Sequence, residues 1–203
     1  MELKKGYKHS EVGIIPEDWN LALIPHIISK KDGIKIGPFG SQLKKDLLTT
    51  IGYKVYGQEN VYEKNMNIGN RFINKEHFEK LKTCEIKGGD FLISMMGTIG
   101  KTMIVPNGIE TGIMDSHLLR LKLNNKIIYS ELLQHYFTSN IILNQVINLS
   151  VGGIMNGLSS KIIKSILVPI PLTIKEQTEI ATILTDTDKL TNSIEKQIGR
   201  AHV

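Results

Sequence analysis

The C-terminal part of the chain has the clearest pattern of apolar and polar positions. An apolar strand is predicted at 166–171, and Thr173 and Glu176 have the Thr-x-x-Glu spacing of a capping box, so a helix should begin near Ile174. A narrow stripe with alternating spacings of three and four residues follows the helix: Ile180, Ile183, Thr187, Leu190, Ile194 and Gln197, with Leu184 beside it. Such a narrow seam is typical of a helix that pairs with another helix, whereas a helix lying on its own domain usually has a broader apolar face.

The preceding residues show short apolar segments separated by turns. Strands are predicted at 53–56, 90–96, 102–105 and 117–123, a loop at 33–41, and helices at 75–81 and 131–147, with Asn74 and Ser130 as caps. Together these patterns predict an α+β fold. We expect a curled, mostly antiparallel, β-rich domain with a few helices at 1–172, a coiled-coil-forming helix at 173–198, and a tail at 199–203.

Composition narrows the class of protein. The 203 residues are 41% hydrophobic and 22% charged, and no apolar run approaches the ~20 residues needed to cross a bilayer. The first residues are polar and charged rather than an apolar secretory signal, and the lone Cys84 excludes an internal disulfide. We therefore expect a cytoplasmic protein.

Positive charge is unevenly distributed along the chain. The net charge is +5, and no carboxylate lies between Glu131 and Glu176. Two groups of lysines stand out: Lys161, Lys164 and Lys175 in or beside that stretch, and Lys30, Lys31, Lys35, Lys44 and Lys45 earlier, interrupted by Asp32. Such groups suit the neutralisation of nucleic-acid phosphates. The alternative from charge alone is an ordinary solvated surface.

Motifs for catalysis are incomplete. Residues 97–102 end like a phosphate-binding P-loop, but the first glycine is missing and 102–105 reads as a strand rather than a helix. The Glu-x-Lys at 85–87 resembles a nuclease motif without an evident acidic partner, and the six histidines lack zinc-ligand spacing. No nucleotide-cofactor or adenine-methylation motif is present. The sequence predicts neither a catalytic centre nor a metal site in this chain.

Several segments, in this order, resemble one family. They are GIIPEDW at 13–19, GPFGSQLKK at 37–45, GGDFLIS at 88–94 running into GTIG at 97–100, GLS at 157–159, and the passage from 170–171 to Glu176-Gln177 and Ile180-Ala181. The order is similar to a target recognition domain and spacer helix of the DNA specificity subunit of type I restriction-modification systems. Each motif is weak alone, but five in the right order are specific.

The resemblance implies a non-catalytic subunit that binds double-stranded DNA and selects its sequence. Separate modification subunits would bind S-adenosylmethionine and methylate adenine, and a restriction subunit would use ATP and Mg²⁺ to translocate and cut. Family members usually carry two recognition domains separated by paired helices, whereas this sequence has one domain and one helix. It is therefore either a half-length subunit that dimerises through the helix to read a palindromic split site, or a fragment of a longer chain.

Sequence readout requires amide, hydroxyl and basic side chains on loops that reach DNA. The candidate DNA-binding residues are Ser41, Gln42, Lys44, Lys45, Gln58, Asn60, Thr98, Lys101 and Asn156. Turn capping is the alternative for Gln58 and Asn60, and a left-handed backbone for Asn156. The candidate helix interface is Ile180, Ile183, Leu184, Thr187, Leu190 and Ile194. Two other functions stay open: a coiled-coil interaction scaffold, and a nuclease or methyltransferase with an unrecognised site.

Overall fold

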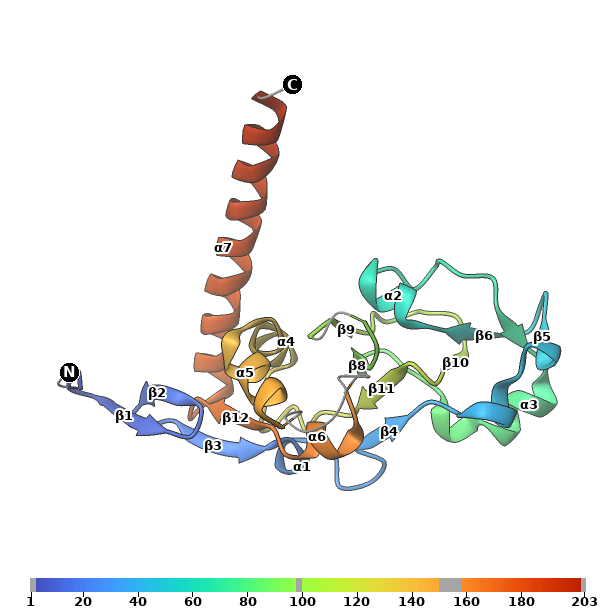
Figure 1. The fold of residues 1–203 in the computed structure, drawn as a ribbon, viewed down its shortest axis with the longest axis horizontal. Helices are drawn as coiled ribbons and strands as arrows, with labels where there is room; N and C mark the ends of the chain where they lie inside the picture. Colours follow the sequence, from blue (N-terminus) through green and yellow to red (C-terminus); the bar gives the residue numbers. More distant parts are fainter. Residues whose placement is uncertain (1–2, 98–99, 150–157, 202–203) are drawn as a thin grey trace.

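A computed structural model describes residues 3–97, 100–149 and 158–201 (Figure 1). An elongated body carries the β1–β2 hairpin at one end, and the long helix α7 projects away from it. The strands are β1 Tyr7–Ser10, β2 Gly13–Pro16, β3 Asn20–Leu23, β4 Ile34–Ile36, β5 Leu48–Thr49, β6 Tyr53–Tyr56, β7 Phe72–Ile73, β8 Phe91–Ser94, β9 Thr102–Ile104, β10 Gly112–Met114, β11 Leu118–Leu121 and β12 Leu167–Ile170. The α-helices are α1 Ile24–Ile27, α2 Gln58–Tyr62, α3 Lys75–Lys80, α4 Ser130–Thr138, α5 Asn140–Leu149, α6 Ser160–Lys164 and α7 Ile174–Ala201, with 3-10 turns η1 Gly40–Leu43, η2 Lys45–Leu47 and η3 Lys82–Cys84.

The sheets are mostly antiparallel, which confirms the predicted α+β class. One sheet has the order β4-β11-β8-β9 and contains only antiparallel pairs. The other four-stranded sheet has the order β10-β6-β7-β5, in which β10 and β6 run parallel. Two-stranded pairs, β1-β2 and β12-β3, complete the body.

Strand β11 lies between two hydrophobic clusters. Leu119 and Leu121 pack on one side with helices α4 and α5, while Leu118 packs on the other with residues of β6 and β10. All four β11 residues are buried, so the strand is a central one. Alternate side chains of the segment predicted at 117–123 therefore point into two different buried clusters.

Arg120 is the charged residue of this central strand, and only 1% of it is exposed. Its guanidinium donates to Asp32 at 2.6 Å and to the Glu85 carbonyl, and it lies 4.0 Å from Asp90. Partial burial opposes ionisation of Asp32, but hydrogen bonds and charge from Lys122 and Arg120 outweigh it and lower the pKa of Asp32. Asp32 thus pairs with both Arg120 and Lys122 in the fold, in addition to interrupting the early lysine group.

Several predicted elements need correction. The segment expected as a loop at 33–41 contains strand β4, which pairs with β11, and the first residues of η1. The single helix expected at 131–147 is two helices that break at Ser139, whose hydroxyl accepts from the Ile141 N–H at 3.3 Å. Ser130 is the first residue of α4 rather than its cap, the N-cap position is Tyr129, and the Ser130 hydroxyl donates to Glu131. Helix α7 continues to Ala201, so most of the expected tail at 199–203 is helical. Gly199 lowers helix propensity by only about 1 kcal/mol, which does not end a helix of this length.

Asn74 caps α3 as predicted and gives a stability test. Its side chain accepts from the His77 N–H at 2.9 Å at the start of the helix. Asn74→Ala should lower the free energy of unfolding by about 1 kcal/mol, because an N-terminal amide loses its acceptor. Urea denaturation measures this change, and Asn74→Ser, which keeps an acceptor, should recover most of it.

Candidate nucleic-acid interface

The β8–β9 turn brings several predicted DNA-contacting segments together. It joins antiparallel strands, so residues 97–102 do not lead into a helix as a P-loop requires. Gly100 has φ +85°, and a Cβ there would lie 2.5 Å from the Phe137 carbonyl oxygen, so the turn packs against α4. Lys101 is exposed beside it. The end of the glycine-rich segment is close, because the Leu158 N–H donates to the Met95 carbonyl at 2.8 Å. Thr98 and Asn156 themselves lie outside the described residues.

Helix α2 places Gln58 next to the same turn. The Ser94 hydroxyl donates to the Gln58 side-chain carbonyl at 3.3 Å and also lies 3.1 Å from the Tyr62 hydroxyl. Tyr62 in turn donates to the Met96 carbonyl at 2.5 Å. The half-buried Gln58 is thus held at the turn, and its contact with DNA stays a prediction.

Asn60 has a structural position instead. It is 1% exposed, accepts from the Gly57 N–H at 2.9 Å, and donates to the Asn65 and Ile68 carbonyls at 3.0 and 3.1 Å. These bonds satisfy its amide inside the body, so in this conformation it does not reach DNA. Of the two interpretations of Asn60, the structure supports capping.

A separate groove contains one lysine from each of the two lysine groups noted in the sequence, Lys35 and Lys164. It has a volume of about 390 Å³ and lies between the β4–η1 segment, the α3–η3 segment and α6. Lys35, Lys80 and Lys164 enter it from these three segments, and none of its lining residues is acidic: Ile34, Lys35, Ile36, Gly37, Pro38, Phe39, Gln42, Lys80, Leu81, Thr83, Cys84, Ser160 and Lys164. Lys80 also pairs with Glu76 outside the lining at 2.7 Å.

The loop before η1 shapes the rim of this groove. Gly37 allows close packing, because a Cβ there would lie 1.8 Å from the Asp115 carbonyl oxygen. The Phe39 N–H donates to the Gln42 side chain at 3.3 Å, and the Phe39 ring is 59% exposed. Exposed cations beside an exposed ring suit phosphates and base faces. Phe39 and Lys80 were not predicted for this site, because only the tertiary structure brings them to the groove that Lys164 lines.

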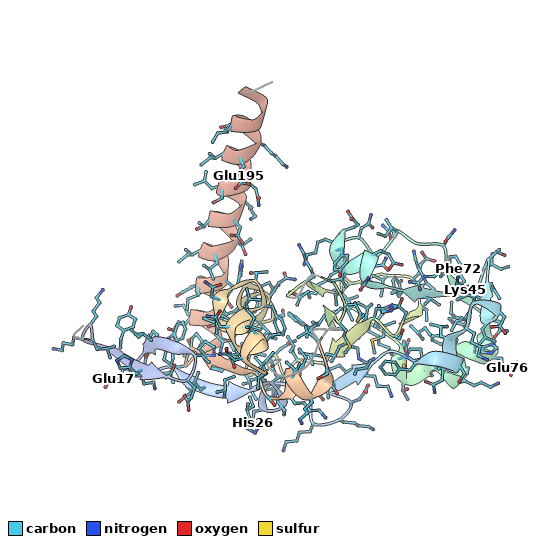
Figure 2. The ribbon with its side chains drawn as sticks, viewed as in Figure 1. Glu17, His26, Lys45, Phe72, Glu76 and Glu195 are labelled. Atoms are coloured by element: carbon cyan, nitrogen blue, oxygen red, sulfur yellow. The ribbon has the colours of Figure 1, made fainter. Side chains whose placement is uncertain are left out.

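The other residues predicted from this loop lie beside the groove. Gln42 lines the groove, and Ser41 lines an adjoining hollow with His77 and Lys80. Lys44 and Lys45 are exposed further along the chain. Figure 2 shows Lys45 towards the end of the body opposite the β1–β2 hairpin. Thus Ser41 and Gln42 lie at or beside the lysine groove and Gln58 and Lys101 at the β8–β9 turn, whereas Lys44 and Lys45 belong to neither.

Helix α7 begins with a rigid connection to the body. Thr173 accepts from the Glu176 N–H at 3.1 Å, while the Glu176 carboxylate accepts from the Trp19 ring N–H at 2.9 Å. Gln177 is 1% exposed, accepts from the Tyr129 N–H at 2.8 Å, and donates to the Ile127 and Pro171 carbonyls. This bonding accounts for a Glu-Gln pair at the start of the helix.

Most of the predicted helix interface faces away from that connection. Gln177, Ala181 and Thr185 contact the body, and Thr185 lies 2.9 Å from His135 on α4. At 3.6 residues per turn, Ile183, Thr187, Leu190 and Ile194 lie on roughly the opposite side. Ile183, Leu190 and Ile194 are 67%, 63% and 46% exposed, and Leu184 is 39% exposed, whereas Ile180 packs partly on the core. Figure 2 shows Glu195 on the part of α7 beyond the body. From Ile183 onwards the stripe therefore does not serve packing on its own domain.

Within residues 3–97, 100–149 and 158–201, no three His, Cys, Asp or Glu side chains gather as metal ligands do. In these same ranges, every helix is too short or too polar to cross a bilayer.

Comparisons with known proteins agree with the resemblance. A family model, the type I restriction modification DNA specificity domain, matches residues 36–200. The chain is 26% identical over 191 residues to the type I restriction enzyme EcoBI specificity subunit of Escherichia coli, covering 93% of this chain and 39% of that protein. The fold is similar to the HsdS subunit of Thermoanaerobacter tengcongensis, with TM-score 0.65, 14% identity, and coverage of 95% and 43%. A chain from a structural study of assembly and conformational transition of the type I R-M system gives TM-score 0.66, 14% identity, and coverage of 94% and 43%. This chain thus spans less than half the length of these proteins.

Proposed function

Because the chain belongs to the type I restriction modification DNA specificity domain family, we propose that it recognises one half of a bipartite DNA target. The single observation that carries this proposal is the groove in which Lys35, Lys80 and Lys164 meet without an acidic lining residue. Lysines placed in this way neutralise backbone phosphates and hold a protein on a duplex, while neighbouring amide and hydroxyl side chains read base edges. Gln42 in the groove and Ser41 in the adjoining hollow are the side chains that would read base edges there.

We propose in addition that two copies of the chain pair through helix α7. The 203 residues span 43% of the length of the solved HsdS subunit. Helix α7 offers an outward apolar stripe for the pairing, with Leu190 and Ile194 exposed. Two identical copies related by a two-fold axis would present two identical reading surfaces. Their target would be palindromic and interrupted by a spacer.

In this proposal, other subunits methylate and cleave the DNA. We propose that modification subunits bind S-adenosylmethionine and methylate adenine, and that a restriction subunit supplies ATP- and Mg²⁺-dependent translocation and cleavage. This division favours a DNA-reading subunit over an independent nuclease or methyltransferase. The groove favours it over a simple coiled-coil scaffold, because a scaffold does not require gathered lysines. A cytoplasmic location belongs to the same proposal.

Co-expression with a cognate modification subunit tests the function. The two proteins should co-purify, and mapping of methylated adenines in the host DNA should reveal one interrupted motif with identical half-sites. The chain without its partner should methylate nothing, since its proposed role is recognition. Methylation by the isolated chain, or an unchanged methylation pattern with both proteins present, would contradict the proposal. A control with the modification subunit alone separates its own background methylation.

A further inference from the structure

Lys64 and Lys101 form a second cationic pair, outside the groove. Lys64 follows α2 with φ +50°, an unusual backbone conformation for a residue with a side chain. Its ammonium group donates to the Thr102 carbonyl, which also accepts from the Gln134 amide at 3.2 Å. Lys101 is the residue immediately before Thr102. The Lys64 side chain therefore extends from the segment after α2 to the start of β9, next to Lys101.

The two lysines lack a balancing anion. Within the described ranges, neither Lys64 nor Lys101 takes part in an ion pair. Partial burial and the positive charge of Lys101 lower the pKa of Lys64. An anion between the two ammonium groups would relieve their repulsion and satisfy their remaining donors.

The surroundings of the pair favour nucleic acid as the source of that anion. The pair lies at the β8–β9 turn, where Gln58 is held by Ser94 and where Leu158 joins the end of the glycine-rich segment to Met95. Polar side chains and backbone next to paired cations match the mixture of groups found where proteins grip a phosphodiester. Met96, 42% exposed at the turn, adds an apolar surface without adding negative charge.

We propose that Lys64 and Lys101 together hold one phosphate of the bound DNA, at a contact separate from the lysine groove. This inference rests on the proposed function, since it assigns a second contact to the same ligand. A protein held on its duplex at two places has a fixed orientation as well as affinity, because two anchored points restrict rotation about either one. The pair therefore positions the recognition domain, while nearby side chains read bases.

A double-mutant cycle tests the pair. Lys64→Asn removes the charge while keeping a residue that tolerates positive φ, and Lys101→Gln removes the second charge. Binding of the full chain to a duplex of the target sequence, or of random sequence if the target is unknown, is measured from low to physiological salt. Each single change should weaken binding by up to roughly fivefold near 0.15 M salt. The double change should make the slope of log affinity against log salt concentration shallower by about one in total. The losses of binding free energy from the two single changes should not add, because both lysines contact one phosphate.

The controls separate this inference from the proposed function. Lys101→Arg keeps the charge and should bind DNA nearly normally, while Lys189→Ala, an α7 lysine paired with Asp186, controls for loss of one charge. If the unmodified chain binds DNA but the double variant binds equally well, the paired contact is wrong and the groove proposal survives. Additive effects with a slope change near two would also overturn a shared phosphate. If the unmodified chain shows no salt-dependent DNA binding, the proposed function itself fails.

Discussion

Replacing Lys35, Lys80 and Lys164 together by alanine should weaken DNA binding on the order of a hundredfold at 0.15 M salt. These three lysines converge in one groove from β4, α3 and α6. Affinity falls with salt, and each phosphate contact contributes about −0.9 to the slope of log affinity against log salt concentration. Loss of three contacts should therefore make this slope shallower by about two to three. The loss of Lys80 should change the slope less than the loss of Lys35 or Lys164, because Lys80 already forms an ion pair with Glu76. The loss should be similar for specific and random duplexes, since phosphates carry no sequence information.

Binding isotherms at several salt concentrations measure this loss. The control triple variant is Lys87→Ala, Lys189→Ala and Lys196→Ala, which changes the net charge equally. Lys87 and Lys189 are paired with Glu85 and Asp186, and Lys196 is exposed on α7 outside the stripe. The control should bind nearly as the unmodified chain does. Both variants should keep the unfolding midpoint almost unchanged, because such surface changes rarely exceed about 0.5 kcal/mol. If the control loses as much affinity as the groove variant, binding reflects net charge and the groove has no special role.

The elements predicted well are those whose signals are local. The strand at 53–56 is found with these bounds, Asn74 caps α3, and α7 begins at Ile174. Each rests on residues within one turn or one strand. The break at Ser139 was missed because the apolar spacing continues across it, and one serine hydroxyl is enough to cap a new helix.

The candidate site was predictable only in part. Lysine-rich segments and the turn at 97–100 could be identified from the sequence, but their meeting points depend on tertiary structure. Lys164 reaches a groove shared with Lys35 although the two are far apart in the chain. Gln58 and Asn60 are two residues apart and looked equivalent, yet one is held at the β8–β9 turn and the other is buried with its amide satisfied. Lys64 was not predicted because a positive φ, not a motif, directs it to Thr102.

The second large effect is expected on α7. Leu190→Glu together with Ile194→Glu should prevent self-association of the chain at micromolar concentrations. Both side chains are exposed in a single copy, at 63% and 46%, and lie on the side of the helix away from the body. Burial of each such side chain contributes roughly 1.5–3 kcal/mol, and a pair of helices buries two from each copy. Replacing these residues by glutamates removes that gain and places like charges together, so the dissociation constant should rise by about a thousandfold or more.

Sedimentation velocity over a range of concentrations measures the association. Thr182→Glu together with Asn192→Glu is the matched control, because both residues are exposed on α7 outside the stripe and the change adds the same charge. The control should remain a dimer, and the stripe variant should sediment as a monomer with its body intact. An unmodified chain that stays monomeric at high concentration would exclude pairing between identical copies. The stripe would then pair with a different helix, either on another chain or elsewhere in a longer polypeptide, and the DNA target would have two unlike halves, which methylation mapping distinguishes from a palindrome.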